Sequence, residues 1–377
     1  MSKLALAIHG GAGTILKSLM TPELEREYRS GLEEALKTGW EILTKGGSSL
    51  DAVEAAVCSL EDFHLFNAGR GSVFTHEGKN EMDAAIMDGQ HLKAGAVAFV
   101  KNVKNPIKLA RLVMERTEHV LLAGAGANQF AQQMNVEMAD DAYFFTEHRY
   151  EQLLKARAEG VVVLDHTPTE QLAAGESIFT AETPRRGESE SEPGSCSPPS
   201  KGGVPAGRGG PATGSTSADG LSEDGDASSS DSDRKSQIEN RKSLGTVGAV
   251  ACDSFGNLAA ATSTGGMTNK QFGRIGDTPI IGTGTYADNA TCAVSCTGHG
   301  EYFMLGVTAY DVAARMKYAG IDLIPAARAS IDYLTSIDGE GGLIAVDALG
   351  NVTLPFNSEG MYRGWISDGR QYVEIYR

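Results

Sequence analysis

The apolar residues of this chain follow two patterns, a helical spacing in some segments and short continuous runs in others. Leu32, Leu36 and Leu43 keep a helical spacing behind Thr21 and Pro22, an N-cap threonine followed by a proline at the first helical position. The spacing therefore predicts a helix that ends at the glycine pair 46–47. Further helices are predicted over residues 50–60 (with Ser49 as the cap), 106–116, 128–134, 146–159, 310–316 and 325–334.

Short runs rich in small and β-branched residues predict the strands. The runs 247–252 and 258–262 flank the turn-forming segment 253–257, which indicates a hairpin. Other strands are predicted in the run before His9 and over residues 81–87, 92–100, 120–123, 343–346 and 352–354. Helices occur in both halves of the chain with antiparallel hairpins between them, so we expect helices covering antiparallel sheets and one core shared by both halves.

Both patterns stop in a tract of serine, glycine, proline and mixed charge that runs from about Thr183 to Lys242. Between residues 184 and 236 its only large apolar residues are Val204 and Leu221 and it has no aromatic one, too little to offset the entropy of ordering. We therefore predict a disordered linker over about 165–245.

The tract gives way abruptly to the strand pattern at the bond between Gly245 and Thr246. One interpretation is a flexible linker between two domains. The alternative is cleavage at this bond, which would divide the chain into subunits 1–245 and 246–377. Thr246 would then combine a hydroxyl nucleophile with a free amine, its own general base, in one residue.

Composition excludes some classes of function but does not identify the function itself. The chain has 377 residues, is 41% hydrophobic and carries a formal charge of −16. The acidity lies mostly outside the low-complexity tract, which argues against a nucleic-acid or anionic-membrane surface. The first apolar run is too short for a secretory signal and no run approaches a membrane span, so we expect a soluble cytoplasmic protein. The five cysteines form no even disulfide framework.

Hydroxyl groups and a charged pair follow the predicted hairpin. The segment 262–270 is rich in hydroxyls and glycines, and the hairpin would return Thr264 towards Thr246. Arg274 and Asp277 could hold the α-carboxylate and α-amino groups of a free amino acid, although a surface ion pair is the commoner meaning of such spacing.

Two further segments offer donors for a developing oxyanion. Segment 295–301 is interpreted as a turn at a strand end, where Thr297 and the backbone N–H of Gly298 could form an oxyanion hole. His299 in the same turn is more typical of a solvent-facing residue. Asn67 offers an amide donor, but a tight-turn asparagine is equally compatible. The glycine-rich stretches match neither the dinucleotide fingerprint nor the phosphate loop, and we expect no organic cofactor.

Taken together, these segments resemble the plant-type L-asparaginase/isoaspartyl aminopeptidase family of N-terminal-nucleophile hydrolases. The resemblance covers about residues 5–134 and 245 almost to the end. It rests on six segments in the same order, namely 9–13, 66–69, 82–89, 245–250, 262–266 and 296–298. The long tract before Thr246 departs from the family.

The resemblance implies an α+β fold, a four-layer αββα sandwich, with self-cleavage between Gly245 and Thr246 and a homodimer of cleaved protomers. It assigns Thr246 as nucleophile with Thr264 supporting it, and Asn67 near the scissile bond. Arg274 and Asp277 would bind the substrate, and Thr297 with Gly298 would stabilise the oxyanion. The family also binds a structural sodium ion in the loop that here includes Leu60, Glu61, Phe63, Phe66, Ala68 and Arg70.

The expected substrate is a small molecule, L-asparagine or a β-aspartyl dipeptide, hydrolysed through an acyl-enzyme intermediate on Thr246. There are three alternatives: a relative acting on glycosylated asparagine, a threonine endopeptidase, and a non-catalytic amino-acid binder of the same fold. The absence of a secretory signal and of a disulfide framework disfavours the first, and the Arg274–Asp277 pair disfavours the second.

Overall fold

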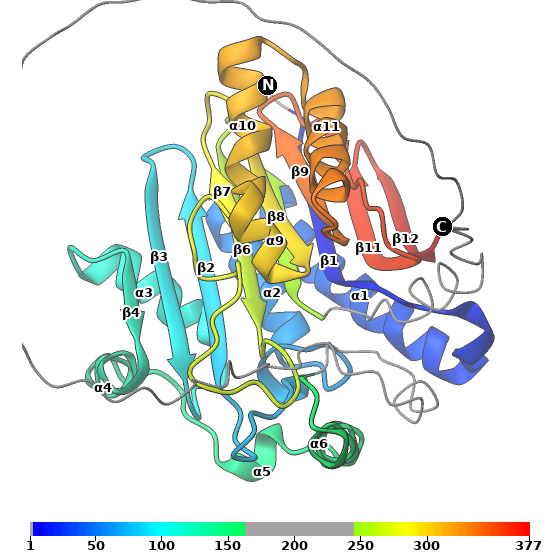
Figure 1. Ribbon diagram of the computed structural model, residues 1–377. Helices are drawn as coiled ribbons and strands as arrows, with labels where there is room; N and C mark the ends of the chain where they lie inside the picture. Colours follow the sequence, from blue (N-terminus) through cyan, green and yellow to red (C-terminus); the bar gives the residue numbers. More distant parts are fainter. Residues whose placement is uncertain (1–2, 163–244) are drawn as a thin grey trace, which may run out of the picture. The chain divides into compact units, whose positions relative to one another are not determined.

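Two β-sheets form the centre of the part of the chain that this computed structural model describes, residues 3–162 and 245–377 (Figure 1). Eight strands lie in the order β12-β11-β1-β5-β6-β2-β3-β4, and four lie in the order β10-β9-β8-β7. The strands are β1 (Ala5–Gly13), β2 (Met82–Asp88), β3 (Lys93–Val100), β4 (Leu121–Ala123), β5 (Val247–Cys252), β6 (Leu258–Thr264), β7 (Thr285–Ala287), β8 (Cys292–Gly298), β9 (Gly341–Asp347), β10 (Val352–Thr353), β11 (Gly360–Ser367) and β12 (Arg370–Tyr376).

Helices pack on the faces of these sheets. The helices are α1 (Pro22–Thr44), α2 (Ser49–Glu61), α3 (Pro106–Arg116), α4 (Gly124–Gln133), α5 (Asp141–Phe144), α6 (Glu147–Glu159), α9 (Gly300–Gly306), α10 (Thr308–Ala319) and α11 (Leu323–Ser336), with the 3₁₀ turns η1 (Lys17–Leu19) and η2 (Gly69–Gly71). This mixture of helices and largely antiparallel sheets confirms the α+β class. The predicted disordered linker lies outside the described residues, apart from its last residue, Gly245.

The larger sheet combines strands from before and after Thr246. Strand β5 pairs with β1, so that Gly248 lies opposite His9, and β6 lies between β5 and β2 with Thr264 opposite Asp83. The strand that starts after Thr246 is therefore held on both sides by antiparallel partners. This pairing fixes the position of Thr246 at the end of a buried strand.

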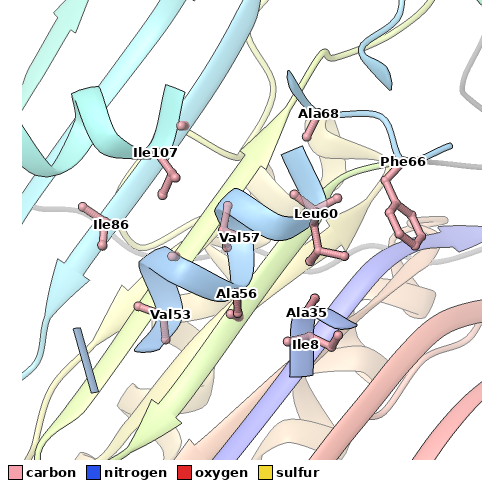
Figure 2. Packing of buried hydrophobic residues seen from close by; sticks show 14 of the residues in the cluster. Ile8, Ala35, Val53, Ala56, Val57, Leu60, Phe66, Ala68, Ile86 and Ile107 are labelled. Carbon is pink, nitrogen blue, oxygen red and sulfur yellow. The ribbon is translucent and has the colours of Figure 1, made fainter. Parts of the chain in front are cut away.

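The inner strands β1, β5 and β6 of the larger sheet are buried on both faces, since successive side chains point to opposite sides. On β1, Leu6 and Ile8 join a cluster with α1 and α2, whereas Ala5 and Ala7 join a cluster with residues of the smaller sheet. Figure 2 shows Ile8 beside the α2 residues of the first cluster. Small side chains on the second face allow the two sheets to approach closely.

The smaller sheet has the same two-sided burial. Val294 of β8 and Leu343 of β9 pack with α9, α10 and α11, while Ala293 and Ile344 face the cluster shared with the larger sheet. In Figure 1, α10 and α11 lie across β8 and β9. The apolar residues of both sheets thus form three clusters along the stacking direction.

Several expected elements need correction. Ser48, not Ser49, caps α2: its hydroxyl accepts a hydrogen bond from the Asp51 N–H at 3.1 Å, and Ser49 is the first helical residue. Residues 295–298 belong to strand β8 rather than to a turn, because they pair with β9 along their whole length. The pattern gave no indication of β7, β11, β12, α5 or α9, which are short or interrupted by glycine and charge.

Within residues 3–162 and 245–377, the structure contains neither a membrane-spanning helix nor a disulfide bond. None of its helices combines the length and the apolar composition needed to cross a membrane. The four cysteines within residues 3–162 and 245–377 are free thiols.

Candidate active site

Thr246 lies directly before β5 and is buried, with the peptide bond to Gly245 intact. Its hydroxyl donates a hydrogen bond of 3.2 Å to Thr264 Oγ1 at the end of the neighbouring strand β6. Thr264 in turn donates to the Gly245 carbonyl oxygen at 3.1 Å. The hairpin therefore does bring Thr264 back to Thr246, and the hydroxyl pair lies beside the bond that the sequence singles out.

The Gly245 carbonyl oxygen has a second donor. Asn67 Nδ2 donates to it at 2.9 Å and to the Gly266 carbonyl at 2.7 Å. The amide orientation is consistent with its other contact, because Asn67 Oδ1 accepts from the Val73 N–H at 3.0 Å. Two convergent donors on one carbonyl are the arrangement that stabilises an oxyanion in acyl transfer.

A small cavity adjoins these residues. Its volume is about 10 Å³, and Gly245, Thr246, Thr264, Arg274, Asp277 and Gly298 all contribute to its wall. The structure thus gathers most of the predicted site residues around one space. A single water molecule fills such a volume, so the uncleaved chain leaves no room for an amino acid.

Arg274 is held by a residue that our sequence analysis did not identify. Its Nε and one terminal nitrogen bind the two carboxylate oxygens of Glu301, each at 2.9 Å. This bidentate pair occupies one edge of the planar guanidinium and leaves the edge formed by the two terminal nitrogens available. Gly276 and Gly300 lie against those nitrogens, where a Cβ would approach within about 3 Å.

Asp277 is buried, and burial is the main reason that its pKa rises to about 7. The positive charge of Arg274 opposes this rise, and the negative charge of Glu301 adds to it. Among the described residues, Asp277 Oδ2 has no hydrogen-bond partner. A buried carboxylate oxygen without a partner is suited to an ammonium group that arrives with a ligand.

Thr297 and Gly298 lie at the end of β8, opposite Gly342 and Gly341 of β9. Gly298 contributes to the cavity wall. The Thr297 hydroxyl is buried and, within the described part of the chain, makes no hydrogen bond. His299 follows as the residue before α9 and lies partly buried, 3.8 Å from Glu301, rather than facing solvent.

His9 is a further buried group near Thr246 that the sequence analysis did not identify. Its Nδ1 lies 2.9 Å from the Thr246 carbonyl oxygen and its Nε2 lies 2.8 Å from Ser295 Oγ. Because a carbonyl can only accept, Nδ1 carries the proton and Ser295 donates to Nε2. Burial lowers the pKa of His9 to about 3, so the ring is neutral.

The hydrogen-bonded chain continues beyond His9 into the second sheet. Ser295 Oγ lies 2.7 Å from Thr262 Oγ1, which accepts from Thr285 Oγ1 at 2.6 Å. A Cβ on Gly248 would collide with both Ser295 and His9, so glycine is required there. This chain of hydrogen bonds holds the Thr246 carbonyl and hence the orientation of the backbone at Thr246.

The loop that follows α2 directs several backbone oxygens towards two of its glycines. The Glu61, His64 and Phe66 carbonyls approach Gly69 and Gly71 so closely that a Cβ at either glycine would collide with them. Of the residues expected to bind sodium, Leu60, Glu61, Phe66 and Ala68 are buried, Phe63 is half-buried and Arg70 is exposed. Carbonyl oxygens are the donors that a hard cation prefers, so the loop is compatible with one.

Known proteins match this chain over nearly its whole length. The family model described as asparaginase matches residues 2–187 and 215–375. The chain is 44% identical to the isoaspartyl peptidase of Salmonella typhimurium and 43% identical to that of Escherichia coli, covering 97% of this chain in each case and 96% and 93% of those proteins. It is 36% identical to the isoaspartyl peptidase/L-asparaginase of Xenopus laevis over 99% of this chain and 96% of that protein.

Proposed function

Because this chain belongs to the asparaginase family, we propose that it is a self-processing amidohydrolase acting on L-asparagine and on β-aspartyl dipeptides. One observation carries the proposal. The Thr246 hydroxyl, paired with Thr264, lies beside a Gly245 carbonyl that accepts two hydrogen bonds, next to the Arg274 and Asp277 side chains. Nucleophile, activated carbonyl and charged binding groups thus adjoin one cavity.

Maturation begins with attack of Thr246 Oγ on the Gly245 carbonyl carbon. The new C–O bond replaces the C–N bond, the hydroxyl proton ends on the released amine, and Asn67 and Thr264 stabilise the oxyanion. Water then hydrolyses the ester, leaving a carboxylate on Gly245 and a free α-amine on Thr246. Before this step the Thr246 nitrogen is an amide and cannot act as a base.

In turnover the α-amine takes the proton of its own hydroxyl as Oγ attacks the side-chain carbonyl of the substrate. A free α-amine has a reference pKa of about 8, suitable for base catalysis near neutral pH. Thr297 and the Gly298 N–H stabilise the oxyanion, and ammonia or an amine leaves with the proton. Water hydrolyses the β-aspartyl ester and releases aspartate.

The charged groups select the ends of the substrate. The free edge of the Arg274 guanidinium binds the α-carboxylate, and Asp277 binds the α-ammonium group. Glu301 acts through Arg274 as a positioning residue. A polypeptide with a blocked α-amine would leave Asp277 buried without a partner, which disfavours an endopeptidase.

For the whole protein we propose an αββα sandwich, a homodimer of cleaved protomers and a reducing, cytoplasmic location. Three stacked apolar clusters support the four layers, and the free thiols support the reducing compartment. Native mass spectrometry of the matured protein tests the dimer, and a mass corresponding to one cleaved protomer would contradict it. Cell fractionation tests the location.

We also propose that the loop after α2 holds a structural sodium ion through the backbone oxygens of Leu60, Glu61, Phe63, Phe66, Ala68 and Arg70. The convergence of carbonyls on Gly69 and Gly71 supports this. The ion would fix the loop that presents Asn67. We expect a lower melting temperature in choline chloride than in sodium chloride at equal ionic strength, because an ion bound only by the folded state stabilises it. Equal values would contradict the site.

Self-cleavage is tested by the mass of the purified protein after incubation at neutral pH. We expect a carboxy-terminal fragment of 132 residues that begins at Thr246, and hydrolysis of asparagine and β-aspartyl dipeptides by the matured sample. Thr246→Ala should remain whole and inactive, whereas Thr246→Ser keeps a hydroxyl and should still cleave. A wild-type chain that stays whole would contradict the mechanism and favour an amino-acid binder.

A further inference from the structure

A second and much larger cavity adjoins the catalytic one. Its volume is about 450 Å³, and it shares Arg274 with the catalytic cavity. Phe99 and Phe272 line it together with Lys101 and the buried Lys270. Lys270 also lies against Gly266 of the catalytic cavity, where a Cβ would be 3.0 Å from its Nζ. Residues of the segment 266–274 therefore contribute to the walls of both cavities.

The aromatic wall of this larger cavity is built from unusual backbone. Phe99 and Phe272 both have a φ of +56°, and Gly273 has a φ of +68°. A bulky residue in this left-handed region costs energy and is common at ligand-binding sites. Buried Asp83 accepts a hydrogen bond from the Phe99 N–H at 2.9 Å, which holds Phe99 in place.

Phe272 precedes Gly273 in the chain, and the Phe99 ring lies close to Gly273. Phe272 is 100% exposed at the rim of the cavity, and a Cβ on Gly273 would lie 3.4 Å from the Phe99 ring. Full exposure of a phenylalanine has a hydrophobic cost that a ligand side chain could remove. The rim thus offers an apolar surface next to Arg274.

The chemistry of the substrate indicates what the larger cavity holds. In a β-aspartyl dipeptide, Arg274 takes the α-carboxylate and Asp277 the α-ammonium group of the aspartyl part. The only part of such a substrate that extends further is the amino acid on the amine side of the scissile bond. Asparagine has no such part, since its leaving group is ammonia.

Charge at the larger cavity is consistent with an anionic end on that amino acid. Positive side chains outnumber negative ones in its wall. Lys101 is half-exposed and lies 2.8 Å from Glu81, and Lys270 donates to the Glu81 carbonyl oxygen at 2.7 Å. Lys101 and Lys79, both half-exposed and each paired with a carboxylate, are cations of this wall that an incoming carboxylate can reach.

We propose that this cavity is the subsite for the leaving-group amino acid of a β-aspartyl dipeptide, with Phe272 and Phe99 contacting its side chain and Lys101 facing its carboxylate. This inference rests on the proposed function, because it takes the position of the aspartyl part from it. It assigns Phe272 as a specificity-determining residue. The predicted preference is for dipeptides whose second residue is apolar and large.

The test compares two substrates in one variant. For Phe272→Ala we expect kcat/KM for β-aspartyl-leucine to fall about tenfold, since a pocket contact with a few methylene groups is worth at least this much. Asparagine hydrolysis should stay within about twofold of wild type. Phe272→Tyr should keep dipeptide activity, because the ring remains.

Phe255→Ala is the matched control. Phe255 is 81% exposed on the turn between β5 and β6, at the far end of β5 from Thr246. The Phe255→Ala substitution should change neither dipeptide hydrolysis nor asparagine hydrolysis. Unchanged dipeptide hydrolysis by Phe272→Ala, or an equal fall with both substrates, would overturn the subsite while leaving the proposed function intact. A wild-type protein inactive on asparagine and dipeptide alike would instead overturn the proposed function, and the subsite with it.

Discussion

At the scale of single residues, the two acidic side chains near Arg274 differ: in the described structure Glu301 forms an ion pair with it and Asp277 does not. Glu301 pairs with Arg274, whereas Asp277 is buried with Oδ2 unpartnered among the described residues, and burial raises its pKa to about 7 against the attraction of Arg274. An acid with this pKa is partly protonated at neutral pH. In the proposed binding mode, the affinity of Asp277 for an ammonium group therefore depends on pH in a range where most carboxylates are fully charged.

We expect the competitive inhibition constant of L-aspartate to increase as the pH falls below about 7. The reason is that protonated Asp277 must release its proton before it can bind the α-ammonium group, at a cost of about tenfold in affinity for each pH unit. The α-ammonium group of the ligand remains charged throughout this range. Inhibition of asparagine hydrolysis between pH 5 and 8 provides the measurement.

Asp277→Asn is the control for this pH dependence. It should bind aspartate weakly and lose the increase below pH 7. Any dependence that remains in this variant belongs to other groups, including the α-amine of mature Thr246. A wild-type inhibition constant that is constant from pH 5 to 7 would contradict the assignment of Asp277.

At the scale of elements, the loop between α2 and β2 carries Asn67, a donor to the Gly245 carbonyl. Asn67 is anchored by the Gly265 N–H, which donates to its carbonyl at 3.0 Å. Buried Arg149 of α6 donates to the Gly71 and Leu65 carbonyls, each at 3.0 Å. The loop is thus connected to a helix that lies just before the long tract.

Replacing Asn67 by leucine should slow self-cleavage by about 10²- to 10³-fold, the usual cost of removing one oxyanion donor. The rate is measured from the appearance of the fragment beginning at Thr246 after synthesis in a cell-free system. Asn80→Leu is the matched control, because Asn80 Nδ2 donates to the Ser72 carbonyl at 2.8 Å and has no contact with Gly245 in the described structure. Cleavage of the Asn67 variant at the wild-type rate would remove Asn67 from the mechanism.

Sequence patterns predicted some of these elements well and others not at all. The run 247–252 coincides with β5, since small and β-branched residues buried on both faces give an unambiguous signal. In β11 and β12, arginine, glycine and glutamate interrupt the apolar positions, so no period of two is visible. For β8, the run of small polar residues resembles a turn, and only its pairing with β9 makes it a strand.

At the scale of the whole molecule, the site is assembled by contacts between distant segments. The hairpin predicted that Thr264 returns to Thr246, and the family resemblance implied that Arg274, Asp277 and Gly298 share their site; all five residues line one cavity. The bond between His9 and Ser295 joins residues 286 positions apart, and no local pattern encodes it. The pairing of Glu301 with Arg274 likewise depends on how α9 packs beside the loop before β7.

The cavity beside Thr246 has a volume of only about 10 Å³ in the uncut chain, and this small size bears on when activity begins. Gly245 forms part of its wall, so on the proposed mechanism the same bond that withholds the base also closes the space for the substrate. The newly made chain is then a zymogen that needs no activating protease. On this mechanism, folding brings Thr246 against the Gly245 carbonyl and so allows cleavage. Each molecule is then activated once, because the broken peptide bond does not re-form.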